Sequence, residues 1–316
     1  MSEALPFFSI VMPLYNKEST VERALRSALN QTVKDFEIIV VNDGSTDNSA
    51  KVVEAICDPR IRLIHQKNQG VSAARNRGIS EAKHDLIAFL DADDEWLPDF
   101  LETILRMVVR YPDCGLYATG YFLGYPSGKQ QPAIVRGLPD DFEGILENYF
   151  EIAVRSNPPV CSSAACARKN VLTQIGGFPL GVKSGEDLLT WAKIAAHFSV
   201  VYSMSCLSIF YQTPSETCET VPSRVPEDDD VVGRGLAELL NIVEADRKAF
   251  LRSYCALWHK MRASCYLRFG MRANARREIC KAFHYVVSLP LIVYWGLSFS
   301  PGFIIQKAFR IGSSNQ

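Results

Sequence analysis

Short apolar runs alternate with helical stretches through the first half of the chain, and this alternation limits the fold more than any other feature. The apolar runs lie at 8–12, 36–41, 61–65 and 86–90, and residues with helical spacing lie between them. Gly, Pro, Asn or Asp residues bound the runs, which favours buried strands over buried helices. Strands joined by helices of this length form βαβ units, in which helices cover both faces of a parallel sheet. We therefore expect an α/β fold with a mostly parallel central sheet and flanking helices.

Local motifs locate several further elements. Ser19-Thr-Val-Glu22 has the spacing of a capping box, so a helix should begin directly after Ser19. Pro98 suits the first turn of a helix, and we predict helices over 100–110, 142–152 and 186–197. The apolar run 200–210 is predicted to be a strand.

The overall composition excludes several classes of protein. Hydrophobic residues at 47% and charged residues at 22% are ordinary globular values, so the chain is neither disordered nor collagen-like. The net charge of −1 excludes a wholly basic nucleic-acid-binding protein, and no nucleic-acid partner is expected. Nine scattered cysteines without a C-x-x-C pair indicate a reducing, cytosolic compartment. The segment 1–8 lacks a basic stretch followed by a long apolar run, so we expect no signal peptide.

Polar clusters follow three of the predicted strands, at 13–16, 43–46 and 91–93. In an open α/β sheet, ligands bind outside the carboxyl ends of the strands. Asp91 and Asp93 are two acids at i, i+2 behind an apolar strand, and carboxylates together with substrate phosphates are usual ligands of Mg²⁺ and Mn²⁺. An isolated D-x-D pair is also explained by a capping or solvated turn. The three clusters together favour a ligand site.

Several motifs occur in the order typical of one enzyme family, and they are Ser9–Asn16, Gln31–Thr32, Glu37–Asp47, Asn68–Gly78, Phe89–Asp94 and Gly185–Asp187. In this order they resemble the family 2 inverting glycosyltransferases of the GT-A fold, over about residues 7–215. The resemblance implies a Rossmann-like GT-A catalytic domain at 1–215. Its donor-binding half would cover about 1–112 and its acceptor half about 113–215.

The resemblance also implies roles for individual residues. Those lining the nucleotide pocket would be Pro13, Tyr15, Asn16 and Glu18. Asp43 would accept hydrogen bonds from the base edge, typically uracil, and Arg75 would approach the base or the diphosphate. Asp91 would lie near the ribose and the metal, and Asp93 would ligate the Mn²⁺ or Mg²⁺ that bridges the diphosphate. An Asx turn at Asp43 and a surface salt bridge at Arg75 remain as alternatives.

The acid pair Glu186-Asp187 bears on the reaction itself. Inverting sugar transfer needs a base for the proton of the attacking hydroxyl, and the resemblance assigns this role to Asp187. Acids at the start of a helix also interact favourably with its dipole, which is the structural alternative. One departure is visible: Tyr211-Gln-Thr-Pro214 stands where many relatives have a Tyr-Arg-x-His-like stretch that closes over the donor.

The C-terminal part differs from the rest in charge and polarity. From Asp246 onward the chain has 12 Lys and Arg against two Asp and Glu, a net charge of +10. The segment 282–306 contains no Lys, Arg, Asp or Glu, and its prolines and glycines argue against a straight membrane span. We predict a linker or active-site loop at 216–234 and a basic helical tail at 235–316 with a membrane-interfacial segment. The alternatives are a helical appendage packed on protein and a true span.

These features together predict a metal-dependent, inverting glycosyltransferase of class EC 2.4. It would move a sugar from a nucleotide-diphosphate sugar, UDP-linked by family expectation, to a hydroxyl of a glycan or lipid-linked acceptor in cell-surface polysaccharide synthesis. The expected location is cytoplasmic, peripherally associated with the inner face of the plasma membrane. The alternatives are an inactive nucleotide-sugar-binding or scaffold protein and a nucleotidyltransferase; whether the chain forms homo-oligomers is left open.

Overall fold

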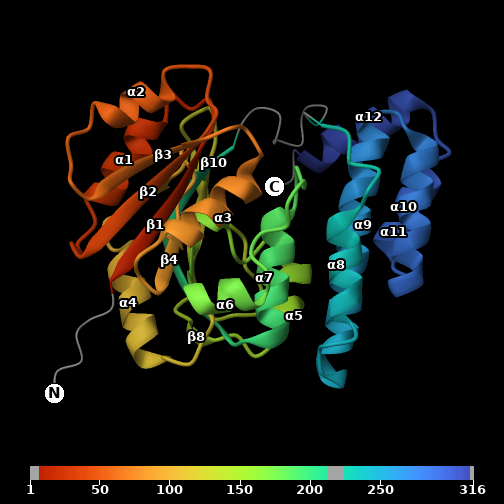
Figure 1. The fold of residues 1–316 in the computed structure, drawn as a ribbon. Coiled ribbons are helices and arrows are strands. Elements are labelled where there is room, and N and C mark those ends of the chain that lie inside the picture. Colours follow the sequence, from red (N-terminus) through yellow and green to blue (C-terminus); the bar gives the residue numbers. More distant parts are fainter. Residues whose placement is uncertain (1–6, 213–221, 223, 314–316) are drawn as a thin grey trace. The chain divides into compact units, whose positions relative to one another are not determined.

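A computed structural model describes residues 7–212, 222 and 224–313, with side chains to residue 309 (Figure 1). By its internal contacts the chain divides into two compact units. Unit 1 comprises the described residues up to Gly124 together with Gly128–Tyr211, and unit 2 comprises Tyr125–Ser127 together with the described residues from Gln212 onward. Each unit is described below by itself.

Within the described residues, unit 1 is built on one ten-stranded sheet in the order β3-β2-β1-β4-β9-β6-β10-β5, with β7 beside β6 and β8 beside β10. The strands are β1 (Phe8–Leu14), β2 (Phe36–Asp43), β3 (Ile61–Gln66), β4 (Leu86–Phe89), β5 (Glu95–Trp96), β6 (Leu116–Gly124), β7 (Gln130–Pro132), β8 (Glu143–Ile145), β9 (Ala165–Arg168) and β10 (Val200–Tyr211). The strands β1–β4, β6 and β10 run in one direction, and β5, β7, β8 and β9 run in the other. The expected mostly parallel sheet is therefore confirmed, with a minority of antiparallel strands.

Helices cover both faces of this sheet (Figure 1). They are α1 (Val21–Leu29), α2 (Ser49–Glu54), α3 (Val71–Glu81), α4 (Phe100–Arg110), α5 (Tyr149–Arg155), α6 (Lys169–Gln174) and α7 (Glu186–His197), with a short 3₁₀ turn at Ser162–Ala164. Because both faces are covered, every residue of β1 is buried, which explains its continuous apolar sequence.

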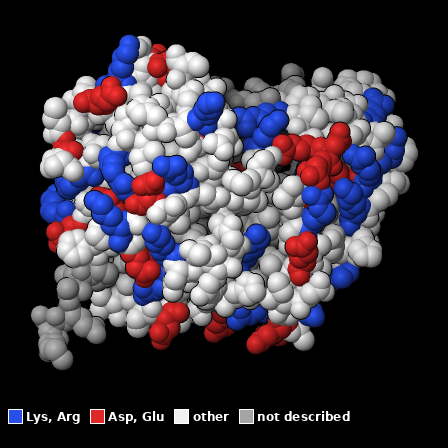
Figure 2. All heavy atoms as spheres, viewed as in Figure 1, with Lys and Arg blue, Asp and Glu red and all other residues white. Residues whose placement is uncertain are grey.

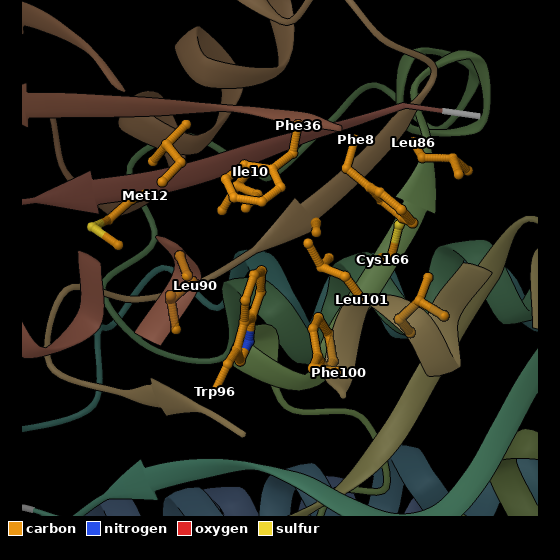
Figure 3. Close-up of a cluster of buried hydrophobic side chains, with 14 of the residues drawn as sticks. Phe8, Ile10, Met12, Phe36, Leu86, Leu90, Trp96, Phe100, Leu101 and Cys166 are labelled. Atoms are coloured by element: carbon orange, nitrogen blue, oxygen red, sulfur yellow. The ribbon is translucent and has the colours of Figure 1, made fainter. Parts of the chain in front are cut away.

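The hydrophobic core of unit 1 has a layer on each face of the sheet. Figure 3 shows alternate side chains of β1, including Phe8 and Ile10, beside side chains of β2, β4 and α4. Trp96 belongs to the same layer, and its ring stacks on Phe100 at 4.3 Å between centroids. On the other face, the ring of Phe89 lies 5.8 Å from that of Trp191 on α7. Each large side chain buried in this way contributes about 1.5–3 kcal/mol to folding.

Two local predictions were wrong. The expected capping box is absent: α1 begins at Val21 after Thr20, whose side chain makes no capping hydrogen bond. Glu22 instead accepts a hydrogen bond from Arg26 Nε at 2.8 Å, one turn further along the helix. The predicted helix at 142–152 is replaced in its first part by β8, because Glu143–Ile145 pairs with β10, and α5 begins only at Tyr149.

Unit 2 is helical in its described part, as predicted for the tail. Its helices are α8 (Val231–Leu239), α9 (Ala245–Arg268), α10 (Arg272–Tyr285), α11 (Leu289–Leu297) and α12 (Gly302–Ser313). The first helix begins at Val231, before the predicted start, because Asp230 Oδ1 caps it by accepting from Gly233 N at 2.9 Å. Of the predicted linker at 216–234, residues 216–221 and 223 lie outside the described residues. Among the described helices, none has both the length and the apolar character needed to cross a membrane.

Buried charges join α8, α9 and α10 within unit 2. Glu278 is fully buried and accepts hydrogen bonds from His259 Nδ1 at 2.8 Å, Arg262 Nε at 3.1 Å and Lys281 Nζ at 3.0 Å. Burial alone would raise the pKa of Glu278, but the bonds from His259 and Lys281 and the charge of Arg262 outweigh it and lower the pKa to about 2. Arg262 Nε also lies 3.5 Å from Asp230 Oδ2. These contacts make the cluster an ionic link between the three helices.

Candidate functional site

Three polar loops meet at one edge of the sheet. β1 lies between β2 and β4 and is parallel to both, with Leu14 opposite Asn42 and Val11 opposite Phe89. The loops that follow these strands therefore leave the sheet side by side, at its carboxyl edge. The candidate site consists of these loops together with the beginning of α7.

The loop after β1 is held to the loop after β2 by Asn16. This residue has a φ of 52°, the left-handed conformation that Asn tolerates better than most residues. Its Oδ1 accepts hydrogen bonds from Thr46 N at 2.8 Å and Thr46 Oγ1 at 3.3 Å, and its own N–H donates to Ser45 Oγ at 3.1 Å. These bonds hold the loop after β1 against the loop after β2.

Other residues of the predicted nucleotide pocket lie in the same two loops. Glu18 Oε2 accepts from Asn48 N at 2.9 Å, at the start of α2. Pro13 is buried within β1, whereas the side chain of Tyr15 is 47% exposed. The structure thus places Pro13 in β1 and Tyr15, Asn16 and Glu18 in the loop that follows it, where all three are exposed.

Asp43 lies at the end of β2 and is 3% exposed. Its Oδ1 accepts from Gln66 Nε2 at 2.7 Å and Gln69 N at 2.9 Å, and its Oδ2 accepts from Gly70 N at 2.8 Å. These bonds fix the segment that leads into α3. Because a carboxylate has about four acceptor positions, Asp43 can accept a further hydrogen bond. The Asx turn considered for Asp43 is not formed, because the three bonds to its carboxylate come from Gln66, Gln69 and Gly70; the neighbouring Asn42 accepts from Ser45 N at 3.0 Å.

Arg75 on α3 bridges two carboxylates that are far apart in the sequence. Its Nη2 donates to both carboxylate oxygens of Asp91 at 2.9 Å, and its Nη1 donates to Glu186 Oε1 at 3.0 Å. The arginine side chain is only 3% exposed, so the ion pair is buried and not on the surface. Burial would lower the pKa of Arg75, but the two carboxylates outweigh this and raise it, so the residue stays charged.

The acid pair after β4 has two different environments. Both oxygens of Asp91 are engaged by Arg75. The side chain of Asp93 is 29% exposed, and its Oδ2 accepts from Lys17 Nζ at 2.5 Å. An accessible carboxylate can ligate an oxygen-preferring ion such as Mn²⁺ or Mg²⁺, which would compete with Lys17 for Oδ2 of Asp93. The residues present therefore fit a divalent metal, with Asp93 better placed than Asp91 to ligate it.

Asp94, which sequence reasoning did not single out, lies with Asp91 and Asp93 in the loop after β4, which we call the acid loop, and connects it with the 3₁₀ turn and with β10. It is 1% exposed, and it accepts hydrogen bonds from Ser163 Oγ at 2.5 Å and from Tyr211 N at 3.0 Å. Burial, with the charges of Asp91 and Asp93 in addition, raises the pKa of Asp94 well above its usual value. Asp94 thus connects the acid loop with the end of β10, where the sequence departs from the family pattern.

A second cation lies beside the acid loop. Arg23 on α1 donates from Nη2 to the backbone carbonyl of Asp93 at 2.5 Å, and its guanidinium lies 3.9 Å from the ring centroid of Tyr211. The hydroxyl of Tyr211 in turn donates to Glu95 Oε2 at 3.0 Å. Sequence reasoning missed both Arg23 on α1 and Lys17 in the loop before it, because Lys and Arg side chains usually face solvent and no local pattern distinguishes these two.

Asp187 is the second residue of α7 and is partly buried. Gly185 precedes the helix with a φ of 83°, a left-handed conformation that Gly adopts without strain. Burial and the neighbouring charge of Glu186 raise the pKa of Asp187 to about 7, although the charge of Arg75 acts in the opposite direction. A carboxyl group with this pKa can exchange a proton near neutral pH.

A second group of metal-type ligands lies in unit 2. Among the described residues, the ligand atoms of Asp230, His259 and Glu278 lie within 4.8 Å of one another. The guanidinium of Arg262 approaches both carboxylates, at 3.1 Å and 3.5 Å. Because a bound cation already neutralises these acids, we assign the group to the ionic link described above and not to a metal centre.

Comparison with known proteins identifies the class. Residues 9–161 match the family model described as "Glycosyl transferase family 2". An uncharacterized glycosyltransferase of Rickettsia conorii is 34% identical over 195 residues, which is 61% of this chain and 30% of that protein. The chain therefore belongs to glycosyl transferase family 2 over residues 9–161. It spans less than a third of the length of this curated relative.

Solved structures show that the fold extends over the whole chain. Staphylococcus aureus TarS residues 1–349, in complex with UDP-GlcNAc, matches 98% of this chain and 93% of that one, with a TM-score of 0.70 and 19% identity. The mannosyltransferase PcManGT from Pyrobaculum calidifontis, in complex with GDP-Man and Mn²⁺, matches 98% and 84%, with a TM-score of 0.58 and 17% identity. The fold is thus GT-A-like, including C-terminal helices.

Proposed function

We propose that this protein is an inverting glycosyltransferase that transfers a sugar from a nucleotide-diphosphate sugar, UDP-linked, to an acceptor hydroxyl. The observation that carries the proposal is the bridge made by Arg75. Its guanidinium joins Asp91, on the loop after β4, to Glu186, the neighbour of Asp187. A donor held by the acid loop would therefore lie next to a carboxyl group suited to proton transfer.

The donor would bind at the carboxyl edge of the sheet. Tyr15, which is exposed in the loop after β1, is available to contact the nucleotide. We assign contact with the base edge to Asp43, which keeps an acceptor position, and metal ligation to Asp93 with a contribution from Asp91. A bound Mn²⁺ or Mg²⁺ would supply positive charge to the departing diphosphate. In this scheme Arg75 serves chiefly to position Asp91 and Glu186.

Asp187 would act as the general base. In its ionised form it takes the proton of the attacking hydroxyl, and the carbon–oxygen bond to the sugar forms on the face opposite the departing nucleotide. Its pKa of about 7 leaves a useful fraction ionised at neutral pH. Glu186 is unsuited to this role because its Oε1 is bound to Arg75.

We further propose that the acceptor is a glycan or a lipid-linked sugar used in cell-surface polysaccharide synthesis. The enzyme would then work in the cytoplasm, bound peripherally to the inner face of the plasma membrane through residues 235–316. The net charge of +10 from Asp246 onward supports this location, because inner leaflets carry anionic lipids.

A thermal-shift screen of nucleotide-sugars with Mn²⁺ tests the proposal. A ligand present at 100 times its dissociation constant stabilises the folded state by about 2.7 kcal/mol, so the correct donor should stand out, and EDTA should abolish its effect. Stabilisation by nucleoside triphosphates but by no nucleotide-sugar would instead favour a nucleotidyltransferase. Donor binding without transfer or hydrolysis would favour an inactive nucleotide-sugar-binding protein.

A further inference from the structure

An apolar face of unit 2 is left uncovered where α11 leads into α12. Six large apolar side chains in this region are at least half exposed: Val287 71%, Leu289 73%, Ile292 51%, Val293 50%, Phe299 61% and Phe303 70%. We call these six residues the α11–α12 apolar surface. So many exposed apolar side chains in one short segment mark an interaction site.

The helical spacing places three of these six residues on one side of α11. Leu289, Ile292 and Val293 follow the i, i+3, i+4 pattern of a single helix face. Leu291 lies on the opposite side and is 2% exposed, and Tyr294 and Leu297 pack against the core of unit 2. The helix therefore has an inner apolar face that is buried and an outer apolar face that is exposed to solvent.

Cations border this surface. The guanidinium of Arg276 lies 5.0 Å from the ring centroid of Phe299, and its Nη1 donates to Ser298 O at 3.1 Å. A side-chain nitrogen of Arg272 lies 3.8 Å from the point that a Cβ on Gly302 would occupy. Figure 2 shows further Lys and Arg side chains over the helices of unit 2, with some Asp and Glu among them.

We infer that the α11–α12 apolar surface inserts into the interfacial layer of an anionic lipid bilayer, while the neighbouring arginines contact the headgroups. Exposed aromatic and aliphatic side chains next to cations are the pattern of proteins that lie on membranes. A second copy of the chain fits less well, because it would bring the same cations into contact with each other. The inference extends the proposed location of the enzyme by naming the surface that makes the contact.

The test is co-sedimentation of the full chain with vesicles, without donor or acceptor. Vesicles of phosphatidylcholine alone are compared with an equal mixture of phosphatidylcholine and phosphatidylglycerol. We expect binding to the anionic vesicles to be about tenfold tighter or more, and to weaken as salt is added. The double variant Phe299→Ser, Phe303→Ser should lower this binding about tenfold or more.

A matched control is Val109→Ser with Leu180→Ser, which removes two side chains of unit 1 that are 61% and 65% exposed. This control should bind vesicles like the unaltered chain. The phenylalanine variant should retain its thermal shift with nucleotide-sugars, so loss of lipid binding and loss of donor binding are separate results. Equal binding to both vesicles, or no effect of the phenylalanine substitutions, would overturn the inference. A concentration-dependent dimer that the same substitutions dissociate, without vesicle binding, would assign the surface to a second copy.

Discussion

Replacing Arg75 by Gln removes the cation between the acid loop and the start of α7. In the intact protein this guanidinium makes three hydrogen bonds of 2.9–3.0 Å to Asp91 and Glu186, with the arginine side chain 3% exposed. Removing one partner of a buried ion pair typically costs about 3–5 kcal/mol. Domains have a total stability of about 5–15 kcal/mol, so the variant should fold but unfold at a much lower urea concentration.

The same substitution should change how activity depends on pH. Arg75 lowers the pKa of Asp187, so its removal should raise that pKa further above 7. A neighbouring opposite charge shifts a pKa by on the order of 1 unit or more. The acidic limb of the rate profile should therefore move to higher pH by about that amount. The measurement is kcat/KM against pH with the donor identified in the thermal-shift screen.

Arg75→Lys is the control, because it keeps the charge and loses the planar fork that reaches both acids. It should lose stability, but its acidic limb should stay close to that of the unaltered enzyme. A Gln variant with unchanged urea midpoint and unchanged pH profile would refute the assignment of Arg75 as the positioning residue.

Three further predictions concern single carboxyl groups. Asp93→Ala should remove the effect of EDTA on donor binding while leaving the melting temperature without ligand nearly unchanged; calorimetric titration of the donor with and without Mn²⁺ checks this. In the unaltered enzyme, Asp187 has a raised pKa of about 7 and must be ionised to act as a base, so kcat/KM should fall as the pH drops through about 7. Glu278 has a pKa lowered to about 2, so the stability it contributes is complete above its ordinary pKa and is lost as the pH falls from about 4.5 towards 2. Glu278→Gln should cost about 3–5 kcal/mol at pH 7, measured by urea unfolding, and the difference should shrink in acid.

The sequence predicted the elements whose signals are local. The helices over Phe100–Arg110 and Glu186–His197 are observed with the predicted bounds, because each has a clear start and a strong apolar period. The segment 143–145 was assigned to a helix instead of a strand because its structure depends on pairing with Val201–Ser203, a partner distant in the sequence. The expected capping box failed for a different, local reason: Glu22 has a competing partner in Arg26, four residues further along the helix.

In the candidate site too, features with local sequence signals were predicted and contacts between distant residues were not. Motif order brought out the residues at the strand ends, and the topology of the sheet does place those loops side by side. The pairing of Arg75 with Glu186, and that of Lys17 with Asp93, could not be derived in this way. Both join side chains that come together only after the sheet has formed, and neither partner has a local pattern that identifies the other.

The most direct test of the central claim is the turnover of Asp187→Asn. Asparagine preserves the shape of the side chain but cannot accept the proton, so sugar transfer in the presence of Mn²⁺ should fall by about 10²–10⁴-fold. The thermal shift given by the donor should remain, because Asp187 takes no part in holding the nucleotide. Turnover close to that of the unaltered enzyme would contradict the account and require a different base.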